Sequence, residues 1–90
     1  MSQAPSRLRG ARWLIDRIDA GIIALAQLRR LAVAHAARAK PAGFGRDAER
    51  EAEVRAHARH VAGDLGLPPA IADRLSTLLI TDACALQGLD

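Results

Sequence analysis

Cysteine and aromatic residues are nearly absent from this sequence. Its 90 residues include one cysteine, Cys84, one tryptophan, one phenylalanine and no tyrosine. A single cysteine cannot form a disulfide within the chain, which is typical of the reducing cytosol, so we expect a cytoplasmic protein. Residues that favour strands are also few, whereas alanine, leucine and arginine are abundant. The composition therefore predicts an all-α fold.

Long apolar runs are absent as well. No run approaches the roughly 20 apolar residues that a membrane-spanning helix requires, and the first ten residues, MSQAPSRLRG, lack the apolar segment of a secretory signal. We therefore expect neither a membrane protein nor a secreted one. Hydrophobic residues still make up 50% of the chain, enough for the core of one domain over residues 1–90. Residues 1–6 are expected to be disordered.

Positive charge is concentrated in the first half of the chain. Residues 1–46 contain nine Lys or Arg and two Asp, a balance of +7, whereas residues 47–90 contain four Arg and eight Asp or Glu, a balance of −4. A basic half suits nucleic acid, a membrane surface or a small anion, and charge alone does not choose among them.

Glycine and proline interrupt the helical pattern at two places. KPAGFGRD (40–47) breaks the first helix, and GLPP (66–69) ends the second with a glycine and opens the third with prolines. The sequence therefore predicts three helices, at about 7–40, 47–65 and 69–88.

The first of these helices is unusually long. About 33 residues span about 50 Å, and two shorter helices cannot cover that length. Its apolar residues follow the 3-4-3-4-3 spacing of a heptad seam. The seam consists of Leu8, Ala11, Ile15, Ile18, Ile22 and Leu25. We therefore expect an obligate homodimer in which the long helices of two copies pack together.

Two cations continue this seam where apolar residues are expected. Arg29 takes the next seam position, and Lys40, eleven residues later, projects from the same face about 16 Å along the axis. Burying an unpaired cation costs several kcal/mol, so an anion is expected between them. The alternative is that Arg29 pairs with an acid of the second helix while Lys40 is solvated at the helix end.

Polar residues of the other helices could complete a site. Asp47, Arg50 and Glu51 have i, i+3, i+4 spacing, and Asp47 can cap the second helix; the alternative is an ordinary helix start. On the third helix, Ala83 and Gln87 share a face, and Gln87 is either exposed or directed into a pocket.

Arg12 is too distant from Arg29 to act in the same site. Seventeen residues separate them, about 25 Å along the helix and about 100° around it. In an antiparallel dimer, Arg12 could reach the site of the other subunit. The alternative is a solvated surface arginine.

Together these motifs resemble the all-α, AroQ-class chorismate mutases. The N-terminal signature of that family reads LRxxIDxID, and residues 11–19 read ARWLIDRID, with alanine in place of the leucine. The resemblance spans residues 8–88. Its further matches are Arg29, Lys40, the DxxRE pattern of Asp47, Arg50 and Glu51, the GLP turn at 66–68, and Gln87.

The resemblance implies a fold and an activity. The fold is three helices with a very long first one in an intertwined homodimer. The activity is the Claisen rearrangement of chorismate to prephenate, the entry to phenylalanine and tyrosine. No metal or cofactor is implied, because restraint of the substrate and preorganised electrostatics suffice.

The resemblance also assigns roles to cations and an amide. Arg29, Arg50 and Arg12 of the partner subunit would clamp the two carboxylates of chorismate, because guanidinium forks suit that geometry. Lys40 and Gln87 would donate hydrogen bonds to the ether oxygen, where negative charge develops as the C–O bond breaks.

The ring hydroxyl of chorismate would lie near the start of the second helix. Asp47 and Glu51 would hold it. Ala83 stands where the family often has a serine, so one hydrogen bond to substrate is missing, a loss of about 1 kcal/mol.

Two related activities on the same fold stay open. Isochorismate-pyruvate lyases share the IDRID stretch but usually lack DxxRE, which this sequence has. A 4-amino-4-deoxychorismate mutase would differ mainly near Asp47, Glu51 and Ala83, where the ring substituent lies.

Functions of other classes are disfavoured. A basic helical dimer that binds nucleic acid is disfavoured because aromatics that could stack on bases are lacking and the cations lie on an apolar seam instead of an exposed face. A coiled-coil scaffold for a partner protein is disfavoured because Arg29 takes a core position of the seam. His57 and His60 lack plausible third and fourth ligands for a metal. Cys84 is expected to be a small core residue.

Overall fold

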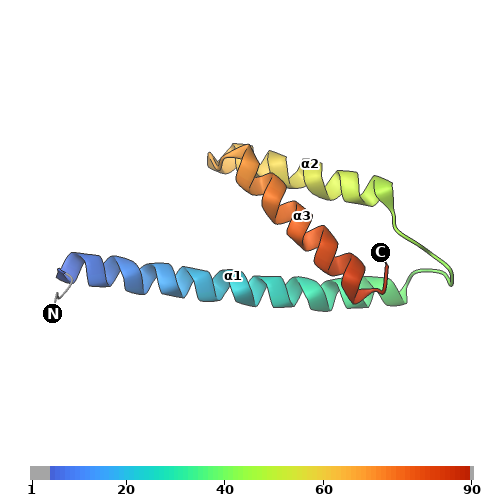
Figure 1. The fold of residues 1–90 in the computed structure, drawn as a ribbon, viewed down its shortest axis with the longest axis horizontal. Coiled ribbons are helices and arrows are strands. Elements are labelled where there is room, and N and C mark those ends of the chain that lie inside the picture. The colour runs from blue at the N-terminus through green and yellow to red at the C-terminus, as the bar shows by residue number, and fades with distance from the viewer. Residues whose placement is uncertain (1–4, 90) are drawn as a thin grey trace.

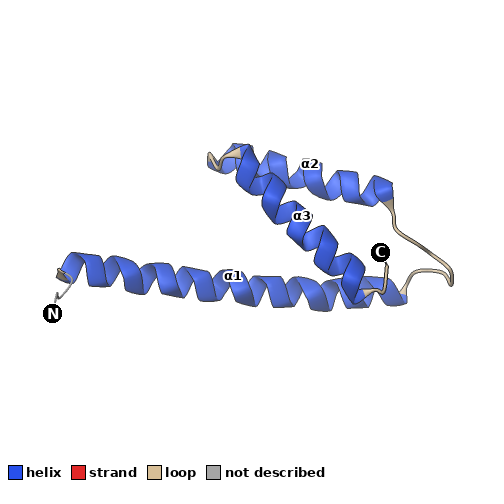
Figure 2. Cartoon of the chain, viewed as in Figure 1, coloured by secondary structure: helices blue, strands red, loops and turns tan. Residues whose placement is uncertain are grey.

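The computed structural model describes residues 5–89 and consists of three α-helices (Figures 1 and 2). They are α1 (Ser6–Arg38), α2 (Ala48–Leu65) and α3 (Pro69–Leu86), and the described residues contain no strand. The all-α prediction is confirmed, and each predicted boundary lies within two residues of the observed one. The predicted disorder of residues 1–6 falls mostly on residues 1–4, outside the described part, whereas Ser6 already belongs to α1.

The ends of α2 and the start of α3 follow the predicted local rules. The Asp47 carboxylate accepts the backbone N–H of Arg50 at 3.0 Å, which caps α2. Gly66 ends α2 with a left-handed φ of 74°, and the N–H of Leu67 returns to the Ala62 carbonyl at 2.8 Å. Pro69 then begins α3, where a missing N–H costs nothing.

Helix α3 contacts both of the other helices (Figure 1). It packs along α2, and its C-terminal end packs against the C-terminal half of α1, whereas α1 and α2 do not pack against each other within the described residues. The few buried residues, Ala62 on α2 and Ala72, Ser76 and Ile80 on α3, lie where helices approach. Most of them are small, so α2 and α3 approach closely at the cost of a very small core.

The seam of α1 is exposed in the single chain. No residue of α1 is buried, and Ile15, Ile18 and Ile22 are each more than half exposed. The accessible surface is 7352 Å², whereas a compact chain of this mass exposes about 5,100 Å². The radius of gyration is 17.4 Å, against about 12 Å for a compact domain. The two shorter helices therefore leave most of α1 uncovered.

None of the helices in residues 5–89 has both the length and the apolar character that crossing a membrane demands.

Candidate active site

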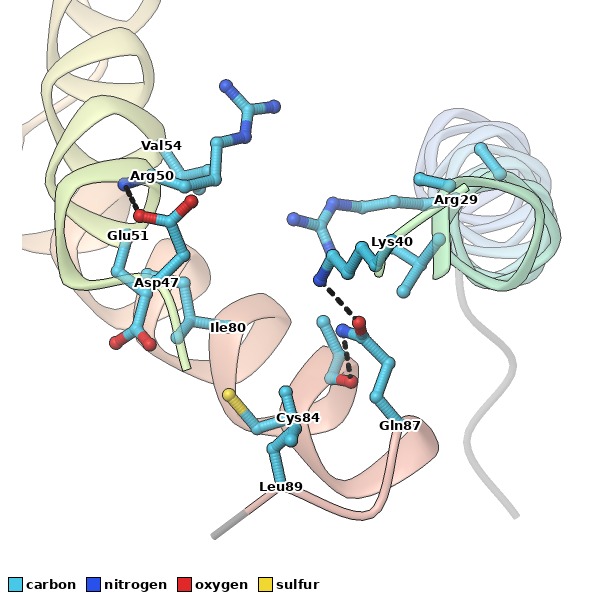
Figure 3. Close-up of a pocket in the computed structure, with 14 residues that line it drawn as sticks. Arg29, Lys40, Asp47, Arg50, Glu51, Val54, Ile80, Cys84, Gln87 and Leu89 are labelled. Carbon is cyan, nitrogen blue, oxygen red and sulfur yellow. Dashed lines mark hydrogen bonds between the residues drawn. The ribbon is translucent and has the colours of Figure 1, made fainter. Parts of the chain in front are cut away.

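A pocket of about 400 Å³ opens between the C-terminal part of α1, the start of α2 and the end of α3 (Figure 3). Seven of the eight candidate site residues line it, namely Arg29, Lys40, Asp47, Arg50, Glu51, Ala83 and Gln87. The rest of the lining is almost entirely apolar and consists of Ala32, Val33, Ala36, Val54, Ile80, Cys84 and Leu89. Polar groups thus converge on a space that apolar side chains partly enclose.

The α1 wall carries the two cations of the seam. Figure 3 shows the side chains of Arg29, on α1, and of Lys40, two residues beyond the end of α1, pointing into the gap toward α2. Arg29 Nη1 donates to the backbone carbonyl of Leu79 at 3.1 Å. Neither cation forms an ion pair with a carboxylate of the described residues. The alternative pairing of Arg29 with an acid of the second helix is therefore wrong, because a carbonyl of α3 takes that place.

Lys40, just beyond the end of α1, and Gln87, at the end of α3, meet across the pocket. Lys40 Nζ donates to Gln87 Oε1 at 2.5 Å and lies 5.5 Å from the centroid of the Phe44 ring. Gln87 Nε2 in turn donates to the Ala83 carbonyl at 2.9 Å. These bonds fix the amide with its oxygen toward Lys40, so both side chains are held in place before any ligand binds.

The α2 wall carries two carboxylates and one arginine. Arg50 is mostly exposed and lies 3.8 Å from Glu53, a weak surface pair. Glu51 accepts two hydrogen bonds from Arg46, at 2.9 and 2.6 Å. These bonds lower the pKa of the Glu51 carboxyl below its ordinary value, so Glu51 is ionised near neutral pH.

The sequence pattern did not identify Arg46 as the partner of Glu51. It precedes the cap of α2 and lies in the loop, at a spacing of five residues from Glu51, so no helical period connects them. Cys84 also departs from its prediction: it is half-buried and lines the pocket instead of lying in the core.

The charge balance of the pocket favours an anion. Arg29, Lys40 and Arg50 line it against two carboxylates, and one of these, Glu51, is already paired with Arg46 from outside. An anionic ligand would supply the charge that the two cations of α1 lack within the chain.

Arg12 lies outside this pocket. It is on α1, 17 residues before Arg29, which corresponds to about 25 Å along the helix. No cluster of three or more His, Cys, Asp or Glu side chains within residues 5–89 is arranged to hold a metal ion.

Comparison with known sequences identifies the family. Residues 11–88 match the sequence model of the family chorismate mutase type II. No curated protein and no solved structure matches the chain. The match covers nearly all of the chain, including α2, α3 and every pocket-lining residue except Leu89. With its three-helix fold and no strand in residues 5–89, the chain belongs to the chorismate mutase type II family, the all-α AroQ class of these isomerase enzymes.

Proposed function

We propose that this protein converts chorismate to prephenate in the pocket between α1, α2 and α3. The observation that carries the proposal is the pair of cations on the α1 wall, Arg29 and Lys40, which face the pocket without a carboxylate partner in the described residues. Chorismate brings two carboxylates, an ether oxygen and a ring hydroxyl. The pocket volume of about 400 Å³ lies within the range of small-molecule sites.

The rearrangement needs no second reactant. One C–O bond breaks as one C–C bond forms within the same molecule, so no proton, electron or atom is exchanged with the protein. The protein must hold the enolpyruvyl arm over the ring and stabilise the charge that develops on the ether oxygen.

Arginines would hold the carboxylates of the substrate. Arg29 has one N–H engaged with the Leu79 carbonyl and keeps others for a ligand. Arg50 is tied only to a long surface ion pair and is free to turn toward the pocket. Each guanidinium can bind a carboxylate through two parallel hydrogen bonds.

Lys40 and Gln87 would act at the ether oxygen. Lys40 uses one of its three N–H groups on Gln87, and Gln87 uses one of its two on the Ala83 carbonyl. Two donors of Lys40 and one of Gln87 therefore remain for the substrate. Because their mutual hydrogen bond already fixes them, little reorganisation is needed as charge develops.

The start of α2 would hold the ring hydroxyl. The Asp47 carboxylate is fixed by its capping bond to Arg50, and Glu51 is fixed by Arg46. Both accept hydrogen bonds, as a hydroxyl requires. Ala83 has no side-chain donor to add on the opposite wall.

We also propose that the working form is a homodimer that shares its sites. The surface of the single chain exceeds that of a compact chain by roughly 2,200 Å², which is enough for an obligate interface. The exposed heptad seam of α1 supplies the apolar face for it. In an antiparallel arrangement, Arg12 of one subunit reaches the pocket of the other and adds a third carboxylate clamp.

A substrate panel tests the proposed function. Pure protein is incubated separately with chorismate, isochorismate and 4-amino-4-deoxychorismate, and products are identified by mass spectrometry. We expect prephenate from chorismate, with kcat/KM for chorismate the highest of the three. Pyruvate release from isochorismate as the main activity would instead indicate the lyase, and a preference for the amine would indicate the amino-substrate mutase. In cells, prephenate formation in the cytoplasm would feed phenylalanine and tyrosine synthesis.

A further inference from the structure

A forked ion pair lies behind the α2 wall of the pocket. Glu51 lines the pocket, whereas Arg46, in the loop before α2, does not. Arg46 Nε donates to Glu51 Oε2 at 2.9 Å, and Arg46 Nη2 donates to Oε1 at 2.6 Å. Each carboxylate oxygen has a second lone pair. The carboxylate can therefore accept a hydrogen bond from a ligand while the fork stays intact.

The fork sets both the orientation and the electrostatic character of Glu51. Two parallel hydrogen bonds fix the plane of the carboxylate, which a single bond would not do. The guanidinium also places a full positive charge next to the negative one, and the Glu51 side chain is only 20% exposed, so solvent screens this charge incompletely. Glu51 therefore presents an oriented acceptor whose charge is largely compensated.

The other charged groups around Glu51 add to this compensation. Arg55 on α2 also acts on Glu51 electrostatically. Arg50 on α2 and Lys40 beside α3 line the same pocket, and Asp47 is the other carboxylate there. Cations thus outnumber carboxylates in the pocket that Glu51 lines and immediately behind it.

We propose that Arg46 is a positioning residue that shifts the selectivity of this site away from a ring ammonium and toward a ring hydroxyl. The proposal rests on the proposed function, in which Glu51 accepts a hydrogen bond from the ring substituent. A neutral hydroxyl gains that bond and is little affected by the cation behind it. An ammonium, as in 4-amino-4-deoxychorismate, is attracted by Glu51 but repelled by Arg46, so it gains little over the hydroxyl.

Replacing Arg46 by glutamine tests this selectivity. The change removes the charge and keeps an amide NH2 as donor, and we expect the ratio of kcat/KM for chorismate to that for 4-amino-4-deoxychorismate to fall by roughly tenfold. Arg46→Lys retains the charge and should restore most of the ratio. Loss of structure alone would lower both values together and leave their ratio unchanged.

The chain offers a matched control in the Arg59–Asp73 pair. This fork has the same geometry, at 2.7 and 2.8 Å, but joins α2 to α3 outside the pocket. Arg59→Gln should leave the substrate ratio unchanged. An unchanged ratio in Arg46→Gln, or an equal change in Arg59→Gln, would overturn the role of Arg46.

The outcome for the proposed function is separate. If the wild-type protein rearranges neither compound, the proposed function is wrong. The role of Arg46 is then decided by calorimetry, from the ratio of the dissociation constants for chorismate and 4-amino-4-deoxychorismate in the wild type and in Arg46→Gln. A wild-type protein that binds neither compound overturns both proposals.

Discussion

Replacing Lys40 by alanine should lower kcat/KM for chorismate by about 100- to 1,000-fold, the range seen when one donor to a developing negative charge is removed. Lys40 is the only lysine in the chain, and its ammonium is held at 2.5 Å from Gln87 Oε1 inside the pocket. Its removal takes away two unused donors and a full charge from the place assigned to the ether oxygen. It also leaves the Gln87 amide held only by its hydrogen bond to the Ala83 carbonyl.

The helices should survive this change. Lys40 lies beyond the end of α1, and its contribution to the helix end is limited to a few tenths of a kcal/mol from the dipole. We therefore expect the circular dichroism spectrum of Lys40→Ala to match that of the wild type. Arg38→Ala is a matched control, because it removes an exposed cation from the last turn of α1 outside the pocket. Activity that persists in Lys40→Ala would remove Lys40 from the chemistry.

Placing a charge on the α1 seam should have the largest effect on stability. Ile18 is 53% exposed in the single chain, and a surface isoleucine can usually be replaced at a cost of less than about 0.5 kcal/mol. In the proposed dimer, Ile18 is buried against the partner, and Ile18→Glu would bury an unpaired carboxylate at a cost of several kcal/mol per subunit. A monomer and a dimer therefore predict very different losses of stability for Ile18→Glu.

Sedimentation equilibrium and urea unfolding distinguish the two cases. We expect Ile18→Glu to be monomeric and largely unfolded, whereas the wild type unfolds at urea concentrations that rise with protein concentration. Ile23→Glu is the matched control, because Ile23 is 71% exposed and lies about 100° around the helix from Ile22, off the seam. If Ile18→Glu is as stable as Ile23→Glu, the seam is not an interface.

Much of the fold could be predicted from the sequence because its signals are local. Gly66, Pro68 and Pro69 mark the turn between α2 and α3, and Asp47 marks the start of α2. The heptad spacing of α1 identified its apolar face. It also indicated that the face would lack cover within the chain, as the exposure of Ile15 illustrates.

Helical periodicity also grouped several candidate residues that line one pocket in the structure. Arg29 on α1 and Lys40, two residues beyond its end, line one pocket, as the eleven-residue spacing predicts. Arg50 and Glu51, one turn from the cap of α2, line the same pocket. Periodicity assigns residues to a face, but the family pattern was needed to connect faces of three different helices.

The contacts that could not be predicted depend on loops and on packing. The fork between Arg46 and Glu51 depends on the path of the loop before α2, where Gly43 has a φ of 81°. The acceptor for Arg29 is a backbone carbonyl, that of Leu79, and a carbonyl exists at every position of the sequence. The sequence pattern therefore suggested an acidic side chain as one possible partner of Arg29, whereas in the structure its partner is a backbone carbonyl.

Mixing two inactive variants tests the shared pocket most directly. Arg12→Ala and Arg29→Ala are each purified and are expected to have little activity on chorismate, because each lacks one carboxylate clamp at every site. In a heterodimer, one site combines the intact Arg29 of one subunit with the intact Arg12 of the other. After the variants are unfolded together and refolded, random pairing should restore about a quarter of the wild-type sites. Prephenate formation at about that level is the predicted result, and a mixture no more active than either variant alone would contradict a pocket shared between subunits.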